Sequence, residues 1–281
     1  MLTSSGLAGI NSFNALNKAT FSLNKSLEKL STGFRINRAS DDAAGLSIAT
    51  KLTAEIMGRD SVSKNIGDGI SSLRTAGGGL DAIEGDLQRM RQLSVQAANG
   101  TNSPEQLNSI QSEISALKGN IDDFAGDTEF NGKSLLNGSG GSTSIVTDPG
   151  GGSQSVDYTG DFTAGSAVAA GNLNEGVTGD IASIDVTVPG GAAAALADID
   201  QALENVTAQM SEYGAQENAL ESMADYNSVK QEALMSSRSR IMDTDFASGI
   251  SEFQNAKVQA KLIASLNSFN SNLILDLLPG K

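Results

Sequence analysis

The sequence predicts a mainly α-helical fold with long amphipathic coiled-coil helices from both termini, a central helical bundle with a β-hairpin, and a small Gly-rich β or loop insertion. Three observations predict it. Apolar residues recur every three or four positions near both ends, the same spacing returns in the inner stretches, and the segment between them is rich in Gly. We expect a terminal inner-core domain of 1–44 and 241–281, a bundle domain of 45–137 and 192–240, and an outward-facing insertion of 138–191.

A heptad seam predicts one helix from residue 5 to residue 34. Its members alternate in steps of three and four and, with one exception, are large and apolar. This N-terminal seam consists of Phe13, Leu16, Thr20, Leu23, Leu27, Leu30 and Phe34. A looser C-terminal stripe consists of Ile250, Phe253, Val258, Leu262, Leu266, Phe269, Leu273 and Leu277. Stripes of this length must be buried, so we expect the two ends to pair with each other and with further copies of the chain.

The segment after the first helix is predicted to be an extended connection between domains, because Gly33 and Gly45 interrupt the helical pattern. The connection carries Arg35, Arg38, Asp41 and Asp42. Adjacent carboxylates could act as acid and base if a cleft raised the pKa of one of them. These two instead lie just before a helical pattern, so capping of that helix, or pairing with the two Arg side chains, explains them better.

Two further helical patterns follow, and the second runs from 60 to 98. It contains three consecutive Gly residues at 77–79, each of which costs about 1 kcal/mol relative to Ala in a helix. We expect a continuous helix whose local stability is lower at these three residues. On a wheel of about 100° per residue, Arg89, Leu93 and Gln96 fall opposite the apolar face. Leu93 is therefore expected to be exposed, either as an isolated surface side chain or as a protein–protein contact.

A helix start is predicted where Ser103 fits the N-cap, Pro104 the first helical position and Gln106 the capping box. An apolar stripe over 107–124 follows in steps of three and four. The Asn-Gly pair at 131–132 then predicts a type I′ β-hairpin.

The insertion contains two alternating runs, 156–158 and 184–188, that predict short strands. It has too few large apolar residues for a substantial core of its own. A heptad that begins at Leu196 predicts another long helix, with a break near 236–239 before the C-terminal helix.

The composition argues against most enzymes and against nucleic-acid binding. The chain has no Cys and no His, so it lacks thiolate ligands and the commonest general base. Residues 134–229 hold 13 Asp and Glu and no Lys or Arg, and carry most of the net charge of −14, whereas binding to phosphates needs a basic face. No apolar run approaches the ~20 residues of a membrane span, and the first 15 residues lack a secretory signal pattern. We expect no cofactor or metal, no nucleic-acid or membrane partner, and export by a route other than the general secretory one.

Four segments resemble bacterial flagellins, in the order in which that family carries them. They are residues 27–46 (LEKLSTGFRINRASDDAAGL), 87–101 (LQRMRQLSVQAANGT), 128–136 (TEFNGKSLL) and 237–247 (SRSRIMDTDFA). The resemblance implies a structural subunit of the extracellular flagellar filament, exported unfolded through the flagellar type III channel, whose termini fold and pair on assembly. It implies as partners other copies of the chain, the flagellar export apparatus, a secretion chaperone, and the filament cap and hook-junction proteins.

The resemblance also implies a contact surface. In flagellins sensed by Toll-like receptor 5, residues matching Arg89, Leu93, Gln96 and Glu113 contact the receptor, and the same helix faces pack between subunits. Three alternative interpretations of the function have weaker support from the sequence. A hook–filament junction protein shares the terminal segments more weakly, a secreted coiled-coil adhesin would carry a signal peptide or anchor, and an enzymatic middle domain is disfavoured by a short Gly-rich segment without His.

Overall fold

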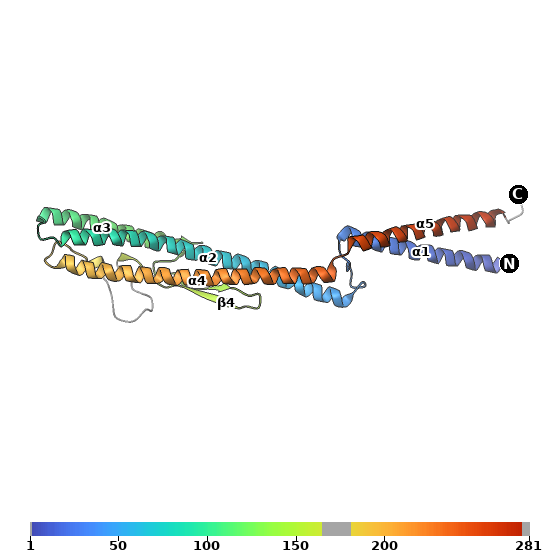
Figure 1. Ribbon diagram of the computed structural model, residues 1–281, viewed down its shortest axis with the longest axis horizontal. Helices are drawn as coiled ribbons and strands as arrows, with labels where there is room; N and C mark the ends of the chain where they lie inside the picture. The colour runs from blue at the N-terminus through green and yellow to red at the C-terminus, as the bar shows by residue number, and fades with distance from the viewer. Residues whose placement is uncertain (1, 165–180, 277–281) are drawn as a thin grey trace. The chain divides into compact units, whose positions relative to one another are not determined.

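The computed structural model describes the backbone of residues 2–164 and 181–276, and the side chains of residues 10–164 and 181–269. The described chain is mainly helical, with small two-stranded sheets in its middle, as predicted (Figure 1).

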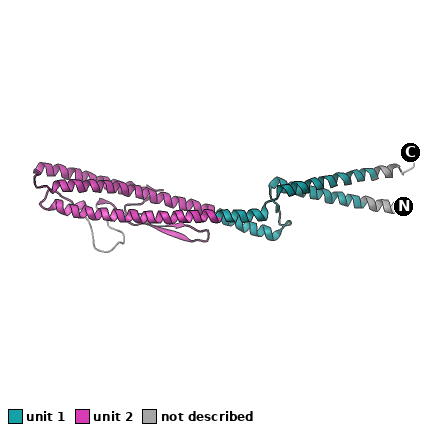
Figure 2. Ribbon diagram, in the orientation of Figure 1, with its two compact units in different colours: residues 1–57, 231–281 teal, residues 58–230 magenta. Residues whose placement is uncertain are grey.

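The chain forms two compact units (Figure 2). Unit 1 consists of residues 1–57 and 231–281, and unit 2 consists of residues 58–230. The boundaries of the three expected domains stay a prediction.

Long helices make up most of both units. They are α1 (Leu2–Thr32), α2 (Ala43–Ala97), α3 (Pro104–Asp127), α4 (Gly191–Met242) and α5 (Phe246–Asp276). The helix expected at 5–34 is α1. It ends because Gly33 takes a φ of 75° and donates its N–H to the carbonyl of Lys29 at 2.9 Å, a left-handed cap that only Gly adopts without strain.

The second and third helical patterns form one helix, α2, which continues through the Gly run at 77–79. The expectation of continuity there is confirmed. Gly79 has a packing reason, since a Cβ at this position would lie 2.6 Å from a methyl group of Leu136 and 2.5 Å from the Thr128 hydroxyl. Gly77 and Gly78 face open space.

The start of α3 and the first hairpin are as predicted. Ser103 caps α3 by accepting from Gln106 N at 3.3 Å, and Gln106 Oε1 accepts from Ser103 N at 2.8 Å. Strands β1 (Glu129–Phe130) and β2 (Lys133–Ser134) pair across Asn131 and Gly132, whose φ values of 52° and 74° fit a type I′ turn.

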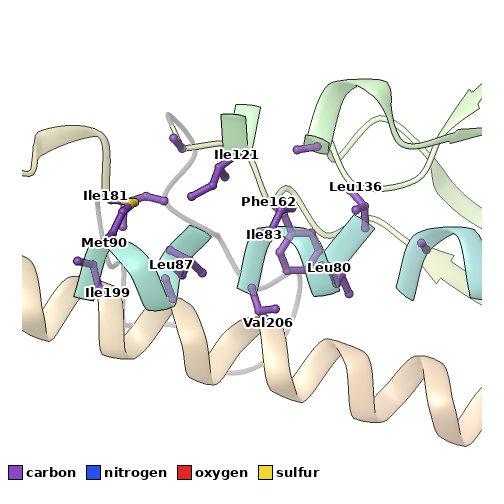
Figure 3. Packing of buried hydrophobic residues seen from close by; sticks show 14 of the residues in the cluster. Leu80, Ile83, Leu87, Met90, Ile121, Leu136, Phe162, Ile181, Ile199 and Val206 are labelled. Carbon is purple, nitrogen blue, oxygen red and sulfur yellow. The ribbon is translucent and has the colours of Figure 1, made fainter. Parts of the chain in front are cut away.

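The expected insertion packs against the helices instead of standing apart from them. It contains β3 (Gly141–Val146), paired antiparallel with β4 (Ser153–Tyr158), and a short 3₁₀ helix, η2 (Ile181–Ser183). Tyr158, Phe162 and Ile181 belong to the same buried cluster as Leu80 and Leu87 of α2 (Figure 3). The helices therefore supply the core that the insertion lacks. That the insertion faces outward stays a prediction.

Two expectations about the later chain are also wrong. Residues 184–188 form turns instead of a strand, and α4 passes through 236–239 and ends at Met242. The heptad of α4 itself is confirmed, since Ile199, Val206 and Tyr213 are buried in the core of unit 2.

Candidate assembly surface

In unit 1, α1 and α5 run side by side and antiparallel, with their free ends together (Figure 1). They meet through small side chains. Ala19 and Ser26 of α1 and Ala256 of α5 are buried, and Gly249 lies against Leu30, whose side chain would be 3.0 Å from an added Cβ. The close approach of the helices therefore depends on residues that the heptad analysis did not select.

The predicted N-terminal seam divides between two sides of α1. Leu16, Leu23 and Leu30 are half-buried toward α5, whereas Phe13 and Leu27 are exposed. Two further apolar residues, Ile10 and Phe21, are also exposed, and Phe21 keeps 71% of its surface open. These two residues lie outside the heptad, so the periodicity of the sequence does not mark them.

Most of the predicted C-terminal stripe is exposed, whereas Phe253 is half-buried. Leu262, Leu266 and Phe269 remain 56%, 59% and 67% exposed, and Val258 is similar. At about 100° per residue, Leu262 and Phe269 lie about 120–140° around α5 from Ala256. The expected pairing of the two ends is confirmed, since α1 and α5 pack along each other. These exposed residues do not take part in that pairing, whereas the half-buried Phe253 lies one turn before Ala256. The side chain of Leu273 lies outside the described residues.

The two connections at the base of this helix pair are tied together. Arg35 N donates to the Met242 carbonyl at 2.6 Å, and Thr244 N donates to the Gly33 carbonyl at 2.9 Å. The Arg35 guanidinium also donates to the Ile241 carbonyl at 2.7 Å. These contacts hold the end of α1 against the start of α5.

Asp41 orders the connection from the other side. It accepts from the backbone N–H groups of Asn37 and Arg38 at 3.2 Å and forms an ion pair with Lys25 at 2.8 Å. The hydrogen bond from Lys25, together with that from the Asn37 N–H, lowers the pKa of Asp41 to about 2. Asp42 caps α2 by accepting from Gly45 N at 2.8 Å.

Capping of the next helix is therefore confirmed for Asp42, and ion pairing of the two carboxylates with Arg35 and Arg38 is wrong for the described residues. Asp41 instead pairs with Lys25 and accepts from N–H groups of the turn, while Arg38 pairs with Glu28 at 3.0 Å.

In unit 2 the structure separates the four residues of the expected contact surface. Arg89 and Glu113 join α2 to α3 by an ion pair of 2.6 Å in which both side chains stay about half exposed, and Gln96 is exposed. Leu93 is only 3% exposed and belongs to the core. The expectation that Leu93 is exposed is wrong, because α3 covers the second side of α2 and the wheel allowed for only one buried side.

In the described residues, no three His, Cys, Asp or Glu side chains are grouped so that they could hold a metal ion. Over the same residues, no helix is both long and apolar enough to cross a bilayer.

Comparison with known proteins points to one family. Models of the bacterial flagellin N-terminal and C-terminal helical regions match residues 5–140 and 196–278. The chain is 36% identical to a flagellin of Bacillus subtilis (strain 168), over 95% of this chain and 97% of that protein. It is 33% identical to the flagellar filament 30.7 kDa core protein of Treponema maltophilum, over 88% of this chain and 90% of that one. The crystal structure of Bacillus cereus flagellin is 28% identical, with a TM-score of 0.49 over 58% of this chain and 88% of the other.

Proposed function

This chain belongs to the bacterial flagellin family and is a structural, non-enzymatic subunit of the extracellular flagellar filament used for motility, and we propose that the apolar faces left open on α1 and α5 are the surfaces through which its copies join. The exposed stripe of α5 is the observation that carries this proposal. Val258, Leu262, Leu266 and Phe269 follow one another in helical steps on the side that does not contact α1. A long exposed apolar stripe on a soluble protein marks a protein–protein contact.

The exposed residues of α1 require more than one neighbour. Ile10 and Phe21 lie about 90° around the helix from Phe13 and Leu27, at about 100° per residue, so one partner helix cannot cover both sets. Burying one such side chain fully contributes roughly 1.5–3 kcal/mol. Each half-exposed residue therefore offers on the order of 1 kcal/mol to an assembly.

The proposal extends to the state before assembly. In the monomer α1 and α5 leave most of their large apolar side chains exposed or only half-buried. Helices of this kind depend on packing for stability. The termini therefore order fully only between copies. Until then a secretion chaperone covers the stripe and the export apparatus carries the chain, and the cap and hook-junction proteins meet it at the filament ends. The family resemblance supports these partners.

Substitution of the stripe tests the assembly role. Leu262→Ser with Leu266→Ser should abolish seeded filament growth, seen by negative-stain microscopy and sedimentation, while circular dichroism shows that the bundle is retained. The matched control is Gln254→Ser with Lys261→Ser, two exposed polar positions of the same helix. Normal filaments from the Leu variant would exclude this stripe as a subunit contact.

A second role, recognition of the released monomer by Toll-like receptor 5, is supported by the exposed Arg89–Glu113 pair and by Gln96. Leu93 would act there only by supporting α2 from inside. Arg89→Ala should lower receptor signalling by monomer without changing the melting temperature, whereas Leu93→Ala should lower the melting temperature. Unchanged signalling by Arg89→Ala would remove this surface as the receptor contact.

A further inference from the structure

An open groove lies on unit 2 between α2, the β1–β2 hairpin and β3. Its volume is about 360 Å³, a size typical of binding sites. Its floor is rigid. A side chain at Gly69 would collide with Ile145, so Gly is what lets β3 approach α2, and the buried hydroxyls of Ser72 and Tyr158 are 2.6 Å apart.

The rim of the groove carries polar side chains that are not satisfied by the chain itself. Asn65 and Asp68 are exposed on α2 and make no hydrogen bond or ion pair within the described residues. Lys133, which also lines the groove, reaches the Thr143 hydroxyl at 3.2 Å but no carboxylate in the described residues. The groove lining therefore holds one negative and one positive side chain that have no ion-pair partner in the described residues, together with the apolar side chains of Leu135 and Ile145.

One wall of the groove is a sheet edge. Residues 143–146 of β3 line it, and β3 has a strand neighbour only on the β4 side in the described sheets. Val146 is exposed at this edge. Exposed edges of this kind are places where another chain adds contacts.

A complementary surface lies on α4 of the same unit. Tyr226 and Val229 are 63% and 67% exposed, more than the other large apolar side chains described in unit 2. They share a helix face, one turn apart, and are flanked by Asp225 and Lys230, whose ammonium lies 5.7 Å from the centre of the Tyr226 ring. These four residues are named the Tyr226 patch.

We propose that the groove of one copy receives the Tyr226 patch of a second copy. Tyr226 and Val229 cover the apolar floor, Lys230 meets Asp68, and Asp225 meets Lys133. The charges favour this occupant, because both rims meet an opposite charge. An aromatic side chain set in a groove and surrounded by polar contacts is also the usual form of an interface anchor.

The geometry of a helical polymer favours a second copy over an unrelated partner. Copies that repeat along a filament join two different surfaces of the same chain, a groove on one and a protrusion on the next. Unit 2 supplies both surfaces. The inference rests on the proposed assembly function and adds to it a contact in unit 2, separate from the apolar faces of α1 and α5.

Cross-linking tests the contact directly, because the chain has no Cys of its own. Ser144→Cys lies in the groove and Val229→Cys in the patch. Mild oxidation of filaments of the double variant should give a ladder of dimers and higher oligomers on a non-reducing gel. Filaments of each single variant should give only the monomer band on the same gel. The matched control with Ser144→Cys and Glu204→Cys should do the same, since Glu204 is exposed elsewhere on α4.

Charge exchange gives an independent readout. Asp68→Lys or Lys230→Asp alone should raise the critical concentration for polymerisation about two- to fivefold, as expected for one exposed ion pair, and the two together should restore it. Filaments without a ladder and with additive charge effects would overturn the groove contact and leave the assembly role of α1 and α5 intact. A disulfide that joins the two Cys residues within one copy, without linking copies to each other, would also overturn it. A parent chain that forms no filaments would overturn both proposals.

Discussion

The three consecutive Gly residues of α2 look alike in the sequence and differ in their surroundings. A side chain at Gly79 would collide with Thr128 and Leu136, while Gly77 and Gly78 face open space. Only the third therefore has a structural reason to lack a side chain.

Single Ala substitutions in this run should have opposite effects. Gly77→Ala and Gly78→Ala should each stabilise unit 2 by roughly 0.5–1 kcal/mol, because Ala has less freedom to lose in a helix. Gly79→Ala should destabilise it by roughly 1–3 kcal/mol through overpacking. Thermal unfolding of the three variants measures this, and a stabilising Gly79→Ala would show that the hairpin does not press on α2.

Asp41 makes the connection of unit 1 sensitive to acid. Its pKa of about 2 lies below the ordinary value of 3.8, so the ionised group stabilises unit 1 above about pH 4, and this contribution is lost as the pH falls toward 2. Asp41→Asn should remove that part of the acid sensitivity. The carboxyl titration followed by NMR should have its midpoint near 2, and an ordinary midpoint would contradict the ion pair with Lys25.

At the scale of helices, the sequence was sufficient wherever the signal is local. The cap of α3 and the Asn-Gly turn depend on a few adjacent residues, and both were predicted to the residue. The wheel for α2 failed at Leu93 because it assumes one buried side, and only the tertiary fold shows that α3 covers another.

The pairing of α1 with α5 shows a second limit. Periodicity selects large apolar residues, but it does not say which partner buries them. Within one chain the small residues Ala19, Ser26 and Ala256 bring the helices together. Leu262 and Phe269 stay exposed among the described residues, and we propose that another copy of the chain covers them.

The segment after η2 was unpredictable for a related reason. It is held by side chains of α3 that look like ordinary surface residues in the sequence. Gln111 accepts from Val186 N and donates to the Ile184 carbonyl, both at 2.9 Å, and Lys118 donates to the Ala182 carbonyl at 3.0 Å.

Removing the hydrogen bonds of Gln111 should make the segment after η2 less stable. Gln111→Ala should destabilise unit 2 by roughly 1–3 kcal/mol, because it leaves the partly buried N–H of Val186 unpaired and the Ile184 carbonyl with only the Lys118 ammonium, 3.4 Å away. Ser115→Ala, one turn further along the exposed side of α3, is the matched control and should stay within about 0.5 kcal/mol of the parent. Denaturant unfolding distinguishes them, and equal midpoints would mean that these hydrogen bonds add nothing.

For the whole molecule, the two units differ in how they are stabilised. Unit 2 has a continuous buried core, whereas α1 and α5 of unit 1 expose most of their large apolar side chains. Amide hydrogen exchange in the monomer should therefore be slow in the core of unit 2 and fast in α1 and α5, and assembly should slow it in the terminal helices. Equally slow exchange in all helices of the monomer would contradict folding on assembly.

In the filament, the side of α5 that faces away from α1 is expected to be buried between copies. A cryo-electron microscopy reconstruction of filaments grown from this chain measures it most directly. We expect Leu262, Leu266 and Phe269 each to lie within about 4.5 Å of apolar atoms of another copy, the usual limit of a packing contact. A filament in which these three side chains face solvent would contradict it.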